Sequence, residues 1–341
     1  MRQLAFFLLA LVMGLTMALG TMPIHQAQAV GATYYVDDDY GNEYPGSGTT
    51  ADPFHTIQMG IDVASSGDTV QVGAGIYFEN ITMKSGIMIQ GAGAGEDPTL
   101  HSIIDGGGTG PVVIAFRVDS TAKLDGFMIT NGNSIHGGGM ANVDSSPTVV
   151  NCLFSGNSSS GPGGGMYNSN SSPTVTNCIF SGNLATRKGG GMYNVFSSPK
   201  VINCIFSGNL AINTGATNAQ GGGIYNDNSS PTVTNSILWG DTPQEIYNEI
   251  SSAPVITYCD VEGSWQGTGN IEADPLFVGG GDYHLTAASP VIDAGTANVA
   301  PKRDIEGNLR PQGRGYDMGA YEFPAARPGA MPWIPLLLLN H

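Results

Sequence analysis

The chain has 341 residues, with 12 Lys and Arg against 28 Asp and Glu, so its formal net charge is −16 at pH 7. Such a chain repels polyanions unless its basic residues gather locally, and only two pairs of basic residues are adjacent, Arg187-Lys188 and Lys302-Arg303. A nucleic-acid partner is therefore not expected, and an anionic glycan would need bridging cations.

Residues 1–29 have the pattern of a secretory signal peptide. Arg2 precedes an apolar stretch over residues 4–19, and Ala27-Gln28-Ala29 is a small-residue cleavage site. The stretch is shorter than the ~20 apolar residues that a membrane span needs. We expect cleavage after Ala29, a secreted protein with no transmembrane span in the mature chain, and an open choice between release and association with the cell surface or outer membrane.

Residues 30–135 lack a regular repeat and are predicted to form an N-terminal cap and irregular strands. Ile57, Ile61 and Ala64 have helical spacing, which predicts a short amphipathic helix over residues 55–64. The run Asp37, Asp38, Asp39, close to Asn42 and Glu43, has the oxygen ligands that Ca²⁺ prefers, but its spacing is not that of an EF-hand. A solvated acidic turn is the alternative, and no other cofactor is expected.

Residues 136–285 contain four copies of one sequence, which start at Gly137, Gly163, Gly189 and Gly221. The third copy reads GGGMYNVFSSPKVINCIFSGN. Its apolar residues form short runs between turn residues, without the spacing of a helix. We expect three short strands per copy, and copies that stack so that each buries the apolar face of the next.

One asparagine in each copy interrupts the alternation of inward and outward side chains. With Val175 inward and Thr176 outward, unbroken alternation would bury Asn177 and expose Cys178. An Asn in the left-handed conformation bends the chain and resets the phase. The predicted bend positions are Asn151, Asn177, Asn203 and Asn235, with Gly126 in the preceding segment and Tyr258 as a departure in the following one.

The cysteines Cys152, Cys178 and Cys204 share one repeat position, and Cys259 aligns with them. Equivalent residues on stacked strands lie about 4.8 Å apart with parallel Cβ vectors, whereas a disulfide needs converging Cβ atoms about 3.8 Å apart. We therefore expect buried free thiols. A metal site is not favoured, because a column does not surround an ion.

Two further columns follow from the repeat. Tyr167, Tyr193 and Tyr225 are expected to face outward as a stacked stripe, which either docks sugar rings or stabilises neighbouring strands. An inward ladder of hydrogen-bonded amides is expected from Asn142, Asn168, Asn194 and Asn226.

Three strands, a one-residue bend and the regular spacing between the starts of the four copies describe one coil of a parallel β-helix. The phrases GGGMYN and CIFSGN resemble the repeats of polymorphic outer-membrane proteins, and most of the chain resembles the right-handed parallel β-helix proteins of the pectin-lyase-like class. The resemblance implies an all-β solenoid with a short N-terminal capping helix. It does not imply one activity, since this scaffold carries lyases, hydrolases, esterases, adhesins and spikes.

Residues 286–324 resemble the closing module called the choice-of-anchor Q domain. We expect Asp304, Arg310, Asp317 and Glu322 to form an ion-paired clasp over the last open edge rather than a catalytic group. Residues 325–341 form a linker and a short apolar tail, which is either an attachment signal or a pairing strand. The resemblance rests on Ser289, Pro290, Asp293, Gly295, Asp304, Gly307, Arg310, Pro311, Asp317, Gly319 and Glu322.

The repeats carry no recognisable catalytic constellation. A lyase of this fold needs a basic residue in a groove and a cation beside the substrate carboxylate, and a hydrolase needs clustered carboxylates. The best catalytic candidates are Arg187 and Lys188 on a loop, with Asp105 or Asp125. His136 is interpreted as a loop histidine.

The sequence thus predicts a secreted or cell-surface β-helix protein with a structural or adhesive role, which binds an extracellular polysaccharide or a cell-surface component. The alternative is a polysaccharide lyase, similar to pectate lyase, or a related carbohydrate-active enzyme on the same scaffold.

Overall fold

The computed structural model describes residues 31–38, 46–97, 99–212 and 219–324. The predicted signal peptide, Asp39, Asn42, Glu43 and the apolar tail lie outside these ranges. The described part of the chain offers no helix with the length and apolarity that a bilayer crossing requires.

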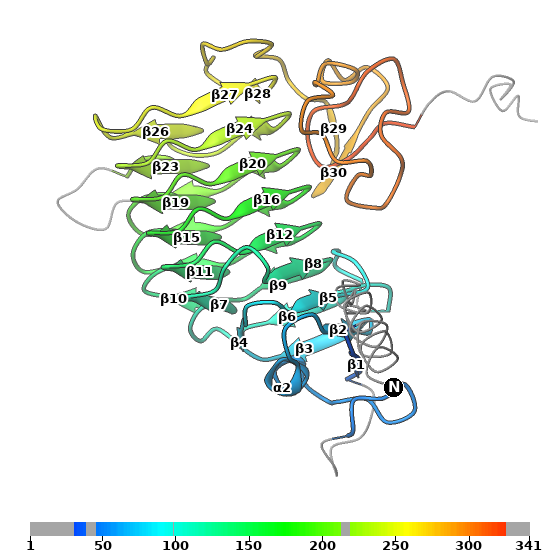
Figure 1. Ribbon diagram of the computed structural model, residues 1–341. Helices are drawn as coiled ribbons and strands as arrows, with labels where there is room; N and C mark the ends of the chain where they lie inside the picture. Colours follow the sequence, from blue (N-terminus) through cyan, green and yellow to red (C-terminus); the bar gives the residue numbers. More distant parts are fainter. Residues whose placement is uncertain (1–30, 39–45, 98, 213–218, 325–341) are drawn as a thin grey trace, which may run out of the picture. The chain divides into compact units, whose positions relative to one another are not determined.

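The described residues form a parallel β-helix whose successive coils stack along one axis (Figure 1). Within these residues, parallel sheets of nine, eight and seven strands run along the coils, and each strand pairs with its equivalent one coil away. Tyr167, for example, pairs with Ala141 on one side and Tyr193 on the other. The predicted all-β solenoid is confirmed, because one sequence repeat makes one coil.

Each of the three long sheets takes one strand from successive coils, so neighbouring strands are distant in the chain. In spatial order, the nine-stranded sheet comprises β1 (Thr33–Val36), β2 (Thr69–Val72), β5 (Met88–Gln90), β8 (Lys123–Asp125), β12 (Thr148–Val150), β16 (Thr174–Thr176), β20 (Lys200–Ile202), β24 (Thr232–Thr234) and β27 (Val255–Thr257). The eight-stranded sheet comprises β28 (Asp260–Val261), β25 (Ile237–Trp239), β21 (Ile205–Ser207), β17 (Ile179–Ser181), β13 (Leu153–Ser155), β9 (Phe127–Thr130), β6 (Ser102–Asp105) and β3 (Gly75–Phe78). The seven-stranded sheet comprises β26 (Ile246–Asn248), β23 (Ile224–Asp227), β19 (Met192–Val195), β15 (Met166–Ser169), β11 (Met140–Val143), β7 (Val113–Phe116) and β4 (Ile81–Thr82).

Two small sheets complete the set. The loops that follow β9, β13, β17 and β21 each contain a further, two-residue strand. The sequence does not predict these strands, since residues such as Ser158-Ser159 carry no apolar run. These strands are β10 (Asn133–Ser134), β14 (Ser158–Ser159), β18 (Leu184–Ala185) and β22 (Leu210–Ala211). An antiparallel hairpin joins β29 (Phe277–Gly279) to β30 (Asp282–Leu285).

The predicted asparagine bends are present between the nine-stranded and eight-stranded sheets. Asn151, Asn177, Asn203 and Asn235 have φ of 51°, 51°, 50° and 53°, and Gly126 has 78°. Tyr258, although a departure in residue type, has φ 52°. The backbone requirement therefore holds at every one of these positions, and Asn meets it at little cost because its short polar side chain tolerates the left-handed region.

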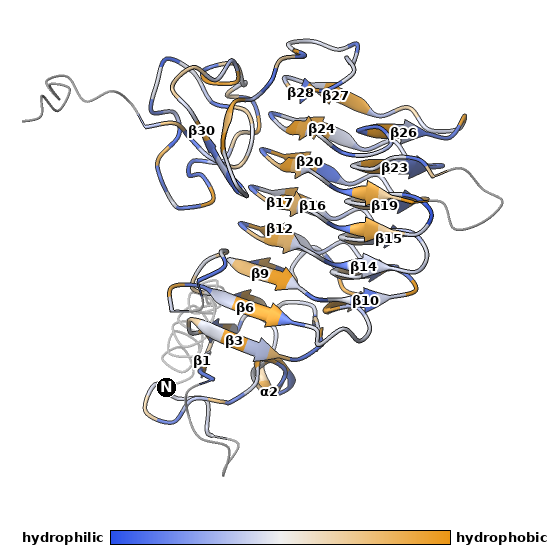
Figure 2. Ribbon diagram, turned by 180° about the vertical axis from the view of Figure 1, so that it is seen from behind, coloured by the Kyte–Doolittle hydropathy of each residue, from blue (hydrophilic) through white to orange (hydrophobic). Residues whose placement is uncertain are grey.

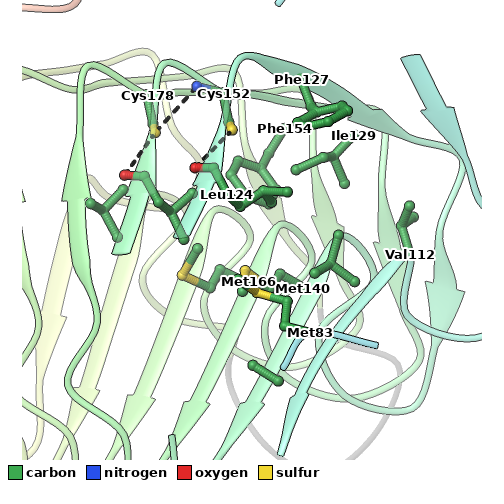
Figure 3. Packing of buried hydrophobic residues seen from close by; sticks show 14 of the residues in the cluster. Met83, Val112, Leu124, Phe127, Ile129, Met140, Cys152, Phe154, Met166 and Cys178 are labelled. Carbon is green, nitrogen blue, oxygen red and sulfur yellow. Dashed lines mark hydrogen bonds between the residues drawn. The ribbon is translucent and has the colours of Figure 1, made fainter. Parts of the chain in front are cut away.

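Inside the coils, equivalent apolar side chains stack into columns (Figure 3). The rings of Phe154, Phe180 and Phe206 are parallel, with centroids 4.7 and 4.6 Å apart. Each such buried side chain stabilises the fold by roughly 1.5–3 kcal/mol. The four cysteines are buried and free, as expected. The amide ladder is also present, with Asn142 Nδ2 donating to Asn168 Oδ1 at 2.8 Å, and the bonds continue to Asn248.

The first coil is closed by helix α2 (Ile57–Val63), which confirms the predicted capping helix. Ile57 and Ile61 are buried against the core. Thr56 caps the helix by accepting a bond from Met59 N at 3.2 Å. Glu79 accepts bonds from Ile57 N and Gln58 N at 2.7 and 3.1 Å, which satisfies the donors that a helix start leaves free.

The last coil is covered by the segment over residues 262–272. Ile271 N donates to Cys259 O at 2.9 Å, and Val261 N donates to Ile271 O at 3.0 Å. Trp265 packs against the main core from this segment. The prediction that residues 286–324 cover the last open edge was wrong, because those residues pack against the side of the coils.

Residues 286–324, together with the β29–β30 hairpin, form a unit beside the coils, which we call the lateral module (Figures 1 and 2). Ile179, Ile205 and Ile237 project from the outer face of the eight-stranded sheet into a second hydrophobic cluster with Val291 and Met318 of the module. The bend asparagines fasten it by donating to module carbonyls: Asn177 to Arg303 at 2.8 Å, Asn203 to Asp317 at 3.1 Å and Asn235 to Thr296 at 2.8 Å.

The expected clasp exists within the lateral module, but only one pair in it is ionic. Arg310 Nη1 and Glu322 Oε2 are 2.8 Å apart, and both side chains are fully buried. Asp317 instead accepts backbone bonds from Asp293 N and Phe323 N at 2.7 and 2.6 Å. Asp304 likewise accepts bonds from backbone and amide donors, including Glu322 N at 3.1 Å.

Candidate functional site

The tyrosine column is stacked as predicted but is mostly covered. Ring centroids are 5.6 Å apart between Tyr167 and Tyr193 and 5.2 Å apart between Tyr193 and Tyr225, and Tyr247 continues the stack at 5.2 Å. His136 lies against Tyr167 at 4.9 Å. Tyr193 is 9% exposed and Tyr225 0% exposed, so the expectation of an open stripe was wrong for these two. Their ring faces contact each other rather than solvent, which favours the strand-stabilising role.

Lys188 closes over this column. Its Nζ lies 4.4 Å from the ring centroid of Tyr225 and bonds the Tyr225 hydroxyl, which in turn donates to Glu249. Lys188 Nζ and Glu249 Oε1 are 3.3 Å apart. The bonds from Tyr225 and Lys188 lower the pKa of Glu249. The Lys188 ammonium thus has two polar partners and an aromatic face, and does not stand free in a groove.

The other catalytic candidates lie on different elements. Arg187 is exposed on the loop before Lys188. Asp125, at the end of β8, pairs with Lys123 at 2.7 Å and accepts a bond from Asn151 at 2.8 Å. Asp105, at the end of β6, accepts bonds from Gly107 N and the side chain of Asn131. Since β6, β8 and the Lys188 loop belong to separate sides of the coils, the structure does not assemble these residues into one site.

The acidic run near the N-terminus is described only in part. Asp38 Oδ2 accepts a bond from Ile76 N at 2.8 Å, so this carboxylate helps to hold β3. In the described ranges no group of three or more His, Cys, Asp or Glu side chains is arranged to hold a metal ion. Asp39 lies outside those ranges, and Ca²⁺ binding by Asp37, Asp38 and Asp39 stays a prediction.

A cleft of about 350 Å³, which we call the lateral cleft, lies where the lateral module meets the coils. Its floor is the outer face of β13 and β17, and its walls are the loop after β5, the β29–β30 turn and Tyr321. This cleft is not predictable from the sequence, because it depends on where the lateral module docks. Its lining residues are Ala94, Gly95, Glu96, Leu153, Ser155, Ile179, Ser181, Gly280, Gly281, Asp282, Tyr283 and Tyr321.

Hydrogen bonds and an ion pair fix the module side of the cleft. The Tyr283 hydroxyl bonds Ser181 Oγ at 2.5 Å and so ties the hairpin to β17. His284 Nδ1 is 2.6 Å from Asp282 Oδ1, and its Nε2 is 3.2 Å from Glu306 Oε1. Burial opposes a charged imidazole, but its bonds to the two carboxylates outweigh burial and raise the pKa of His284. The backbone N–H of His284 in turn lowers the pKa of Asp282, because its hydrogen bond stabilises the carboxylate.

A second polar cluster lies inside the last regular coil. Asn157, Asn183 and Asn209 form an amide ladder that ends at Asp241, whose Oδ1 accepts bonds from Asn209 N and Nδ2 at 2.6 and 2.8 Å. Asp241 N donates to Glu245 Oε1 at 2.9 Å. Asp241 Oδ2 and Glu245 Oε2 are buried and have no partner among the described residues. Burial raises the pKa of both carboxyls.

The chain has a structural neighbour among solved structures and no match in the two other comparisons. No protein-family model matches the chain. No curated protein matches it either. Among solved structures, the crystal structure of pectate lyase Pel9A is similar, with 14% sequence identity and a TM-score of 0.49, over 86% of this chain and 97% of that one. The class that the strand pairing itself defines is the all-β parallel β-helix.

Proposed function

We propose that this is a secreted or cell-surface β-helix protein that binds an extracellular polysaccharide, with the lateral cleft as the binding site. The lining of that cleft carries the proposal. Tyrosine rings offer apolar surface to sugar rings, and serine hydroxyls and carboxylates offer hydrogen bonds to sugar hydroxyls. The signal-peptide pattern of residues 1–29 supports the proposal, since export would bring the protein to polysaccharides outside the cell.

The floor of the cleft is pre-organised. Ser155 and Ser181 are equivalent residues of paired strands, and Leu153 and Ile179 are equivalent in the same way. Strand pairing therefore repeats a hydroxyl and an apolar group at the strand spacing of about 4.8 Å. Ser181 is bonded to Tyr283 and Ile179 is buried in the second hydrophobic cluster, so Ser155 and Leu153 are the more open of these four side chains to a sugar.

A blocking substitution tests the proposal. Ser155→Trp would fill the floor of the cleft, whereas Ser169→Trp, on the seven-stranded sheet, adds the same side chain away from it. We expect the unchanged chain and the Ser169→Trp variant to bind the same glycans on an array, and the Ser155→Trp variant to lose at least ~90% of that signal. Binding by all three proteins alike, or by none, would reject the lateral cleft as a glycan site.

The same glycans test the alternative that the protein is a polysaccharide lyase. A lyase releases unsaturated oligosaccharides that absorb ultraviolet light, and Ca²⁺ would be needed to neutralise the substrate carboxylate. We expect no such release from any glycan that binds. Substrate-dependent absorbance that grows with time would replace the binding role with an enzymatic one.

A further inference from the structure

Charge in the lateral cleft is of one sign. Glu96, on the loop after β5, and Asp282, at the start of β30, belong to different walls, and both are exposed. The residues that line the cleft include neither Lys nor Arg. Two histidines lie beside the cleft walls: His284, which is shared between Asp282 and Glu306, and His101, which lies behind Gly95.

Both carboxylates have oxygens available to a ligand. Among the described residues, the bonds to Asp282 from His284 N and Nδ1 both go to Oδ1, which leaves Oδ2 to a ligand. Glu96 lies on a loop whose backbone packs against His101, since the Cβ of any residue replacing Gly95 would lie 2.7 Å from that ring. This contact with His101 supports the loop, while the Glu96 carboxylate faces solvent.

We propose that the ligand is a polysaccharide that carries free amino groups, a polymer of de-N-acetylated amino sugars. This inference rests on the proposed glycan-binding function and adds the ligand class. The ammonium group of one bound sugar unit would pair with Glu96, and that of a second unit with Asp282. The same two carboxylates would repel a uronate chain. The net charge of −16 adds long-range attraction for a polycation.

Three oligosaccharides of equal length test the ligand class by calorimetry: oligoglucosamine, its fully N-acetylated form and oligogalacturonate. We expect oligoglucosamine to bind at least ~10-fold more tightly than the acetylated form at low salt, with no measurable binding of oligogalacturonate. High salt should remove most of that preference, because exposed ion pairs are screened. The acetylated form probes the ring contacts and hydrogen bonds of the cleft without an ammonium group.

Variants locate the effect in the lateral cleft. The pair Glu96→Gln and Asp282→Asn should weaken oligoglucosamine binding by roughly 2- to 30-fold, as expected for two exposed ion pairs. The acetylated form should lose less affinity, because the amide oxygens of the variant can still accept bonds from sugar hydroxyls. The control pair Asp62→Asn and Asp144→Asn removes the same charge at exposed positions outside the cleft and should change neither affinity.

The outcomes separate the two proposals. Equal binding of amino and acetylated sugars, or a preference for the uronate, would overturn the ligand class but leave glycan binding in place. Equal loss in both double variants would show attraction by net charge alone and would also overturn the inference. Absence of binding by every glycan would reject the proposed function itself.

Discussion

The cysteine column shows what a single buried position does in a stacked fold. Cys178 is 0% exposed, and its Sγ lies 3.3 Å from Thr176 O and accepts a bond from Cys152 N at 3.5 Å. Burial raises the pKa of Cys178. Because the thiolate is the reactive form, such thiols are inert while the coils stay closed.

We therefore expect the native protein to resist iodoacetamide and to take up four labels once it is unfolded without reductant. Intact mass spectrometry measures both results. Ser160→Cys, at an exposed position, is the positive control and should add one rapid label to the native protein. A native mass that gains labels at the four natural cysteines, or an unfolded mass that gains none, would contradict the column of free thiols.

Residue columns were predictable from sequence because repeats align equivalent residues, but their exposure was not. Tyr225 is covered by Lys188, from a variable loop, and pairs with Glu249, which lies beyond the last copy. A second line of left-handed residues was also missed: Asn170 and Asn228 fit that conformation, but the third copy has Phe196 there, with φ 49°. A bulky residue at this position conceals the backbone requirement.

At the scale of elements, the interior of the lateral module contains one buried ion pair, Arg310 with Glu322. Glu322→Gln would leave the Arg310 guanidinium buried with a neutral partner. We expect a loss of about 3–5 kcal/mol in unfolding free energy, as when one partner of a buried pair is removed. Lys123→Met is the control, because it breaks a partly exposed pair that contributes less than about 1 kcal/mol. Urea denaturation of both variants measures the difference.

Replacing both partners, with Arg310→Met and Glu322→Leu, sharpens this test. The double variant should recover part of the loss, because neither Arg310 nor Glu322 is then left buried without its partner. Recovery is incomplete because Arg310 also donates to Asp317 O and Gly319 O, and Glu322 accepts from Gln312 N. If Glu322→Gln and Lys123→Met lower the unfolding free energy by the same amount, the buried pair does not stabilise the lateral module.

The sequence predicted this clasp because its residues are those of an ionic network, but it misplaced the module. Ile179 and Ile205 each follow a cysteine, and Ile237 follows Ser236 at the same repeat position. In sequence they resemble ordinary strand residues, and only the structure shows that the lateral module covers them. Segment 262–272 has no repeat pattern, so nothing marked Trp265 as the cover of the last coil. The lateral cleft depends on that docking, which is why it could not be foreseen.

At the scale of the whole molecule, buried carboxyls make stability depend on pH. Burial raises the pKa of Asp260 to about 7 and that of Asp317 to about 6, and it raises those of Asp241 and Glu245 as well. Unfolded carboxyls titrate near 4. Between these values the folded chain holds protons that the unfolded chain releases, so unfolding free energy falls as pH rises. We expect stability at pH 5 to exceed that at pH 8 by on the order of 2–4 kcal/mol.

Asp241→Asn tests the origin of this slope. The substitution places at position 241 the amide side chain that Asn157, Asn183 and Asn209 have in the preceding coils. The Oδ1 atom of the new side chain can still accept the two bonds from Asn209. Without a charge to bury, the variant should gain about 1–2 kcal/mol at pH 8, change little at pH 5 and show a flatter profile. Asp144→Asn, at an exposed position where the next coil has Asn170, should leave the profile unchanged. Urea midpoints across pH 5–8 decide the matter, since an equal gain at every pH would mean that Asp241 is not a proton-binding position of the folded chain.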